Sequence, residues 1–251
     1  MFYSTLVFEL KKQFGRGRRR YVLLGVGIPV LYYLVFINVA PHGGTTPVEG
    51  TIWRNYLLVS MTAFGSVFMG VSTGGIRFAT ERMSGWLRQL RITPLMPWVY
   101  FLAKIAVALL EPLMLIVVLF VVSHIAIGTS LSFTQWVQEA LALWVGVIPF
   151  IAFGFALGFL VNGQNAGAVQ NLPIFIISYL GGLFQPIFTM PSIMRTIAYA
   201  MPTYNYANIA WGLLAGKSPE IENILVLVGY TLTFILIAVV LYRRDHSRAI
   251  I

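Results

Sequence analysis

The segment TERMSGWLRQLRITPL, residues Thr80–Leu95, is short, charged and helical in pattern. It lies between two apolar runs, Asn55–Ile76 and Phe101–Ser123. A helix of about 20 apolar residues crosses the hydrocarbon of a bilayer, and each of these runs reaches that length. The order of apolar run, charged segment and apolar run therefore predicts two membrane-spanning helices joined at a membrane surface.

The composition extends this interpretation to the whole chain. Of the 251 residues, 58% are hydrophobic and 10% are charged, whereas soluble domains average about 25% charged residues. The chain therefore reads as an integral membrane protein. It has no cysteine, which excludes disulfides, thiolate metal sites and cysteine nucleophiles. Its three histidines and eight acids show no metal-ligand spacing, so no metal site is predicted.

Six apolar runs are expected to form six transmembrane helices, because lipid offers no partners for free backbone groups. The first is interpreted as an uncleaved span, since it is long and its candidate cleavage site would precede Pro41. We expect one all-α polytopic permease domain over residues 1–251, with a basic N-terminal segment (1–20), a bundle (21–242) and a tail (243–251). The six runs are Tyr21–Ala40, Asn55–Ile76, Phe101–Ser123, Trp136–Val161, Leu172–Phe188 and Asn223–Tyr242.

The distribution of basic residues predicts the orientation. Fourteen of the 17 lysines and arginines lie in the N-terminal segment, the connection after the second run with the start of the third, and the C-terminal tail. The opposite side has only Arg54, Arg195 and Lys217. By the positive-inside rule, both termini and residues 80–95 face the cytoplasm. Anionic headgroups, rather than nucleic acid, are the expected partner of the RGRRR stretch at residues 16–20.

Two amphipathic helices are expected on the cytoplasmic side. Residues 1–14 have one apolar face, which predicts a helix lying in the membrane interface or bracing a partner subunit. In the opening segment, Met83, Leu87 and Leu90 share a face, Thr80 is a candidate N-cap and Pro94 ends the helix. This second helix could lie flat on the membrane, or insert into a groove of a soluble partner.

Two stretches resemble the type-2 permease (transmembrane) subunit family of ATP-binding cassette (ABC) exporters. They are ATERMSGWLRQLRITPL at 79–95 and LGGLFQPIFTMPSIMRTIAYAMPTYNYANIAWGLL at 180–214. The resemblance implies a coupling helix between spans two and three that docks on a separate ATPase subunit, and an extracellular helical segment between spans five and six. The implied coupling residues are Glu81, Arg82, Met83, Gly85, Trp86, Leu87, Arg88 and Leu90.

The resemblance also implies a partner set and a transport path. The chain would pair with a second copy of itself or a homologous permease in the inner or plasma membrane. ATP and Mg would bind only the partner ATPase, and no cofactor would bind this chain. Spans two and five would line the path, and their apolar, aromatic surface would suit a drug, a lipid-like molecule or a hydrophobic peptide. The candidate lining residues are Met61, Phe64, Phe68, Phe175, Tyr179 and Phe184.

Three further features bear on the function. WGLLAGKS at 211–218 resembles a phosphate-binding loop, but it has one residue too few between its glycines and Pro219 follows directly, so a nucleotide site there is rejected. GVSTG at 70–74 matches a nucleophile pattern, so an intramembrane serine protease using Ser72 is the alternative enzyme. A non-pumping sensor or immunity subunit is a third hypothesis. Glu111, inside the third run, is a possible intramembrane polar site, either neutral and structural or acting in substrate passage.

Overall fold

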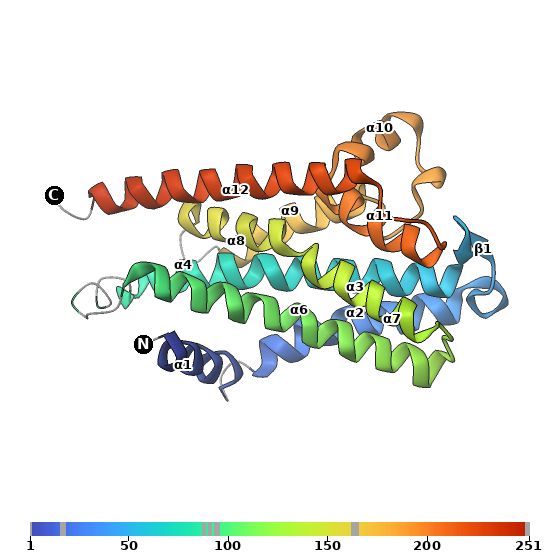
Figure 1. Ribbon diagram of the computed structural model, residues 1–251, viewed down its shortest axis with the longest axis horizontal. Helices are drawn as coiled ribbons and strands as arrows, with labels where there is room; N and C mark the ends of the chain where they lie inside the picture. Colours follow the sequence, from blue (N-terminus) through green and yellow to red (C-terminus); the bar gives the residue numbers. More distant parts are fainter. Residues whose placement is uncertain are drawn as a thin grey trace.

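A computed structural model describes residues 2–15, 19–86, 89, 92, 96–161 and 166–248. The described chain forms an elongated bundle of helices that run roughly along one axis (Figure 1). Its elements are α1 (Phe2–Phe14), α2 (Arg19–Val39), η1 (Pro41–Gly44), β1 (Pro47–Val48), β2 (Thr51–Ile52), α3 (Trp53–Ser72), the π-helix η2 (Thr73–Arg77), α4 (Phe78–Met83), α6 (Pro97–Ile127), α7 (Phe133–Val145), α8 (Ile148–Leu160), α9 (Ala166–Leu180), η3 (Ile187–Thr189), α10 (Ser192–Ala200), α11 (Pro202–Leu214) and α12 (Ile221–Arg248).

Each of the six predicted runs contains a helix, and four of the helices are long and apolar enough to cross a membrane. Among the described residues these four are Trp53–Met83, Trp98–Ile127, Phe133–Leu160 and Ile221–Arg244. Gly25–Val39 and Val169–Leu180 are shorter apolar helices. The architecture is therefore that of a polytopic helical membrane protein, and a count of six spans stays a prediction.

Several predicted boundaries are wrong. The second helix does not stop at Ile76 but continues through η2 and α4 to Met83. The fifth begins at Ala166 and ends at Leu180, earlier than the predicted run 172–188, because Gly182 adopts a left-handed φ of 81° in the turn that follows. The fourth is divided into α7 and α8 at residues 146–147.

The helix α3 forms the centre of the bundle. Sixteen of its 20 residues are buried, since α2, α6, α7, α8, α9 and α11 all pack around it. Glycines allow the closest approach: a Cβ placed on Gly154 of α8 would lie 2.5 Å from the carbonyl oxygen of Val71, and one on Gly74 would lie 2.7 Å from the nitrogen of Phe155. The small residues around Ser72 thus serve helix packing.

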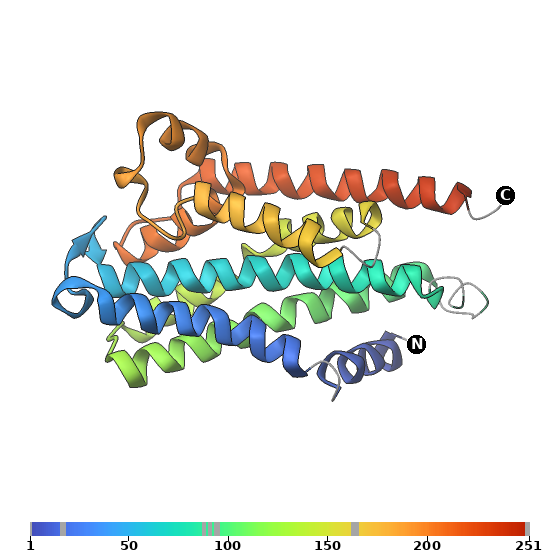
Figure 2. The same cartoon turned by 180° about the vertical axis from the view of Figure 1, so that it is seen from behind.

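The two ends of the bundle differ in composition. We call the charged end the one where α1, α4 and the C-terminal part of α12 lie together, and the aromatic end the one where α10, α11 and the β1–β2 hairpin lie (Figures 1 and 2). Both chain termini are at the charged end (Figure 2). Its assignment to the cytoplasm follows from the basic residues and stays a prediction.

Candidate functional site

The charged end is organised by the rod that α3, η2 and α4 form. In η2 the chain makes a π-helical turn before it resumes an α-helix. Thr80 does not cap a new helix, because it lies inside this rod and its hydroxyl donates to the carbonyl oxygen of Ile76 at 2.7 Å. Glu81, Arg82 and Met83 are therefore the last turn of the second helix, and they move with it.

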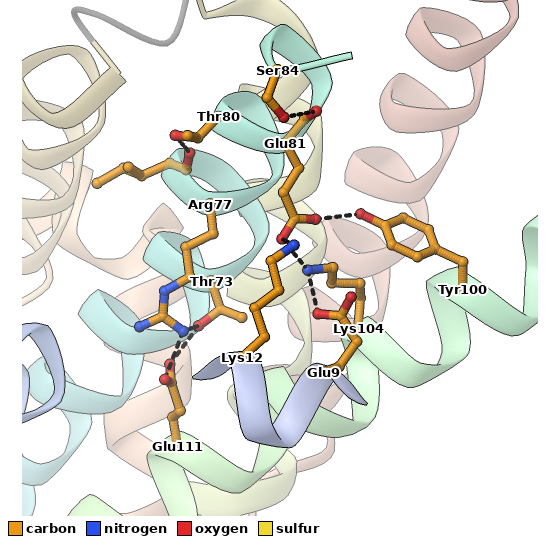
Figure 3. Close-up of polar contacts among 11 residues, drawn as sticks. Glu9, Lys12, Thr73, Arg77, Thr80, Glu81, Ser84, Tyr100, Lys104 and Glu111 are labelled. Carbon is orange, nitrogen blue, oxygen red and sulfur yellow. Dashed lines mark hydrogen bonds and ion pairs between the residues drawn. The ribbon is translucent and has the colours of Figure 1, made fainter. Parts of the chain in front are cut away.

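Glu111 is ionically paired inside the bundle. Arg77 Nη1 lies 2.6 Å from Glu111 Oε1, and the hydroxyl of Thr73 donates to Oε2 at 2.5 Å. Glu111 is 1% exposed. The expectation of a neutral carboxyl, or one bonded to backbone near Pro112, is therefore corrected: a guanidinium from the π-turn is its partner, as Figure 3 shows.

A second cluster surrounds Glu81 (Figure 3). Its Oε1 accepts from Lys12 Nζ at 2.6 Å and from Lys104 Nζ at 2.7 Å, and its Oε2 accepts from the Tyr100 hydroxyl at 2.5 Å. Lys104 Nζ also lies 2.6 Å from Glu9 Oε2. Glu9, Glu81 and Lys104 are each less than 5% exposed, whereas the Lys12 side chain is 25% exposed. Two acids and two bases therefore neutralise one another, and three of the four are shielded from water.

The N-terminal helix α1 is present as expected, but it turns a polar side inward. Glu9 and Gln13 are buried against the bundle, whereas Tyr3 is 77% exposed. The helix packs on α6, and its Phe8 ring stacks on Trp86 with centroids 5.7 Å apart. Lys12 Nζ lies 5.0 Å from the centroid of the Trp86 ring. Three helices therefore meet at Glu81: α1, α4 and α6.

The predicted coupling residues differ in their accessibility. Glu81 is enclosed, and Arg82 donates to the carbonyl oxygens of Phe159 and Val161 at 2.8 and 3.2 Å. Met83 is 59% exposed, and Gly85 has a φ of 75° in the turn that ends the rod. Trp86 follows this turn and is half-buried. Leu87, Arg88 and Leu90 lie outside the described residues, and a docking role for the whole set stays a prediction.

The structure brings most of the predicted pathway residues together. The Phe64 ring lies 4.9 Å from Phe184, 5.4 Å from Phe175 and 6.4 Å from Phe68, centroid to centroid. Met61 and Phe64 are buried, whereas Phe175 and Tyr179 are more than 40% exposed. A hollow of about 440 Å³ lies over this set, lined by Tyr32, Phe175, Ile176, Tyr179, Leu180 and Phe184.

A larger hollow lies elsewhere on the bundle. It has a volume of about 600 Å³ and lies between α6, α8 and α12. Its lining is apolar and aromatic, with Trp98 and Tyr242 among its residues, and none of the predicted pathway residues borders it. The predicted path and the more spacious apolar groove are therefore different surfaces.

The other sequence hypotheses find little support in the described residues. Ser72 Oγ has no hydrogen-bond partner among them, and His124 Nδ1 is instead 3.1 Å from the carbonyl oxygen of Thr129. A serine nucleophile needs a base within hydrogen-bond reach. Within the same residues, no group of three or more histidines, cysteines or acids could hold a metal ion.

Sequence reasoning missed several members of the site. It did not connect Glu9 and Lys12 with Glu81, although each lies on a helix expected at the same membrane surface. It also did not connect Lys104 with Glu9 or Glu81. It also missed Glu139, which lies inside the predicted fourth span and is 1% exposed. For Lys104 and for Glu139, the signal in the sequence was a charged residue within an apolar run.

Comparison with known proteins gives two matches. A family whose description is "ABC-2 family transporter protein" matches residues 29–240. The chain is 30% identical over 227 residues to "Putative transport permease YvfS" of Bacillus subtilis (strain 168). That alignment covers 90% of this chain and 91% of the Bacillus protein, so the similarity extends over most of the length of both proteins.

Proposed function

The chain belongs to the ABC-2 family of transporters, and on that premise we propose that it is the permease half of an exporter driven by a separate ATPase. The chain supplies the membrane path, and ATP with Mg binds the partner subunit. Two permease chains, either two copies or two homologues, form the complete path in the plasma membrane. The substrate is amphiphilic or hydrophobic.

The observation that carries this proposal is the length and bracing of the rod. Trp53–Met83 is 31 residues long, about 46 Å at 1.5 Å per residue, whereas the hydrocarbon is about 30 Å thick. The rod therefore extends past the hydrocarbon at one end or both. At the charged end, the Glu81 cluster joins the last turn of the rod to α1 and α6. A displacement of that turn is therefore transmitted to α1, α4 and α6 at once.

The exposed part of this end supplies the contact with the ATPase. Met83 projects from the rod with more than half of its surface exposed, and Trp86 follows after the Gly85 turn. An apolar side chain in this position suits insertion into a groove of a soluble partner. The enclosed Glu81 and the partly buried Arg82, which bonds to the end of α8, then hold the rod in place, rather than touching the partner themselves.

The aromatic set on α3, on α9 and in the turn after α9 supplies the surface for the substrate. Phe64, Phe175 and Phe184 form a continuous group of rings beside an apolar hollow. No charged side chain is among the described residues that line that hollow, which favours a hydrophobic or amphiphilic substrate over a small ion.

Replacing Met83 with aspartate tests the docking surface. A carboxylate in an apolar groove loses its hydration without gaining a partner. Met83→Asp should therefore abolish co-purification with the ATPase while the permease still inserts into the membrane. Ile193→Asp is the matched control, because Ile193 is 76% exposed on α10 at the opposite end. If both variants retain the ATPase, the docking assignment is wrong.

The absence of cysteine makes the sidedness directly measurable. Met83→Cys should be protected from an impermeant thiol reagent in whole cells and react after lysis, whereas Ile193→Cys should react in whole cells. The reverse pattern would place the rod end outside the cell, where an ATP-consuming partner cannot reach it.

Substitution of the ring cluster tests the substrate class. Phe175→Ala and Phe184→Ala should lower transport of hydrophobic compounds while ATPase co-purification is unchanged. Phe133→Ala is the control, since Phe133 is 83% exposed at the start of α7. Equal transport by all three variants would show that the proposed path is wrong.

A further inference from the structure

Glu139 is the one glutamate among the buried acids of the described residues that has neither carboxyl oxygen bonded. It is 1% exposed and lies on α7, inside the membrane-length helix Phe133–Leu160. The buried acids Glu9, Glu81 and Glu111 each have a cationic partner within 2.7 Å. This contrast singles out Glu139, which neither the transport path nor the Glu81 cluster uses.

Among the described residues, the elements packed against α7 bring no cation to it. They are α11, α6 and α3. From α11, the Tyr206 hydroxyl donates to the carbonyl oxygen of Leu143, one turn beyond Glu139, and the Tyr204 ring lies against Tyr199 and Trp211. From α6, His124 meets the edge of Trp136, whereas Tyr100, Lys104 and Glu111 belong to the charged end.

The titratable groups of α3 are also directed elsewhere. The Tyr56 hydroxyl donates to the carbonyl oxygen of Gly182. Arg54, at the start of α3, lies beside Gly44 of η1. On the buried face of α7, Leu143 belongs to the same core cluster as Ala207 and Ala210 of α11, and all three are 0% exposed. The buried contact between α7 and α11 is therefore mainly apolar.

An ionised carboxylate cannot remain in such a place. The free-energy cost of burying an unpaired charge is so large that the group takes up a proton instead. We propose that Glu139 is a proton-binding site: its carboxyl is a neutral acid while α7 and α11 are packed, and it loses the proton only when the two helices separate and water enters. Deprotonation and helix separation are then two aspects of one event.

Infrared spectroscopy of the purified protein in lipid tests the protonation state. The wild-type minus Glu139→Gln difference at near-neutral pH should contain the carbonyl stretch of a protonated carboxylic acid. The same difference for Glu111→Gln, whose carboxylate is paired with Arg77, should contain carboxylate stretches instead. Carboxylate stretches in the Glu139 difference would overturn the proposal. Gln keeps the shape of the neutral acid, so Glu139→Gln should fold.

Thiol accessibility tests the link to helix packing. Leu143→Cys reports on α7, and Ala210→Cys reports on the facing surface of α11 should the first variant fail to fold. With Glu139 present, the rate of labelling by a small thiol reagent should rise severalfold from mildly acidic to alkaline pH beyond the rise in a Glu139→Gln background. The glutamine background corrects for the ionisation of the thiol itself. An identical pH response in the two backgrounds would refute the coupling.

Discussion

The charged end and the aromatic end of the bundle are held together by different forces. At the charged end, Glu81 and Glu111 anchor two ion-pair clusters that join α1, α4, η2 and α6. At the aromatic end, the rings of Tyr56 and Trp211 stack with centroids 4.7 Å apart, and the indole nitrogen of Trp211 donates to Ser60 Oγ at 3.1 Å. Ion pairs demand specific partners, whereas ring surfaces are tolerant of small displacements.

This difference indicates that the two ends respond differently to a displacement. A buried network of charges permits few arrangements, because any shift leaves an unpaired charge. The charged end should therefore move as one body when it is pushed. The aromatic end can readjust by sliding its rings, since apolar contact is non-directional. Four substitutions test this contrast, from the largest expected effect to the smallest.

Glu81→Ala should have the largest effect. It leaves Lys12 without its acid and Lys104 with Glu9 alone. Breaking a buried pair costs about 3–5 kcal/mol, and unfolding by denaturant in detergent should report a loss of this size. Glu222→Ala, which removes an exposed acid on α12, is the control. An equal loss of unfolding free energy in the two variants would mean that the Glu81 cluster does not stabilise the fold.

Gly154→Ala tests the contact between the two ends, where α8 touches the backbone of α3. The added methyl group would meet the carbonyl oxygen of Val71 at 2.5 Å, and overpacking costs about 1–3 kcal/mol. Gly229→Ala is the matched control, because a Cβ there has no neighbour within 4 Å. Thermal unfolding should give a lower Tm for Gly154→Ala than for Gly229→Ala. An equal fall in Tm for both variants would argue against a tight contact at Gly154.

Trp211→Phe should cost less, about 1–2 kcal/mol, because it removes one hydrogen bond and part of a ring but keeps the stack on Tyr56. Ser60→Ala removes the same hydrogen bond from the other side, and the double variant should therefore cost less than the sum of the two. Strict additivity in that cycle would show that the bond contributes nothing.

Phe8→Ala should have the smallest effect on global stability, about 0.5–1.5 kcal/mol, because Phe8 is 47% exposed. Its effect should be local: α1 should become more accessible to protease as its stack on Trp86 is lost. Phe2→Ala is the control, since Phe2 is also more than 40% exposed. Digestion at the same rate in both would indicate that charge alone holds α1.

The sequence predicted the apolar helices better than their limits. Hydropathy places a boundary at Ile76, but the backbone stays helical because Arg77 and Glu81 find partners on α6, 34 and 23 residues away. No local pattern encodes such pairs. For the same reason the Thr80 cap was wrong: a threonine caps a helix only if the chain before it is not already helical.

The candidate site shows the same division. The ring cluster of Phe64 and Phe175 was predicted, since both lie on apolar runs that the family resemblance pairs. The inward turn of α1 was not, because its apolar periodicity favoured burial of the opposite side. Glu139 could have been found, as it stands within a predicted span; its lack of a partner depends on the packing of three other helices.

The π-turn η2 sets the rotation of α4 relative to α3 within the rod, and that rotation can change. A π-turn holds an extra residue relative to an α-helix. If that residue were absorbed, every side chain from Phe78 onward would rotate by about 100° and translate by about 1.5 Å relative to α3. Glu81 would then leave the side of the rod that faces Lys104 and Tyr100. Rewinding that one turn, with no bending of the helix, would be enough to separate Glu81 from Lys104 and Tyr100 at the charged end.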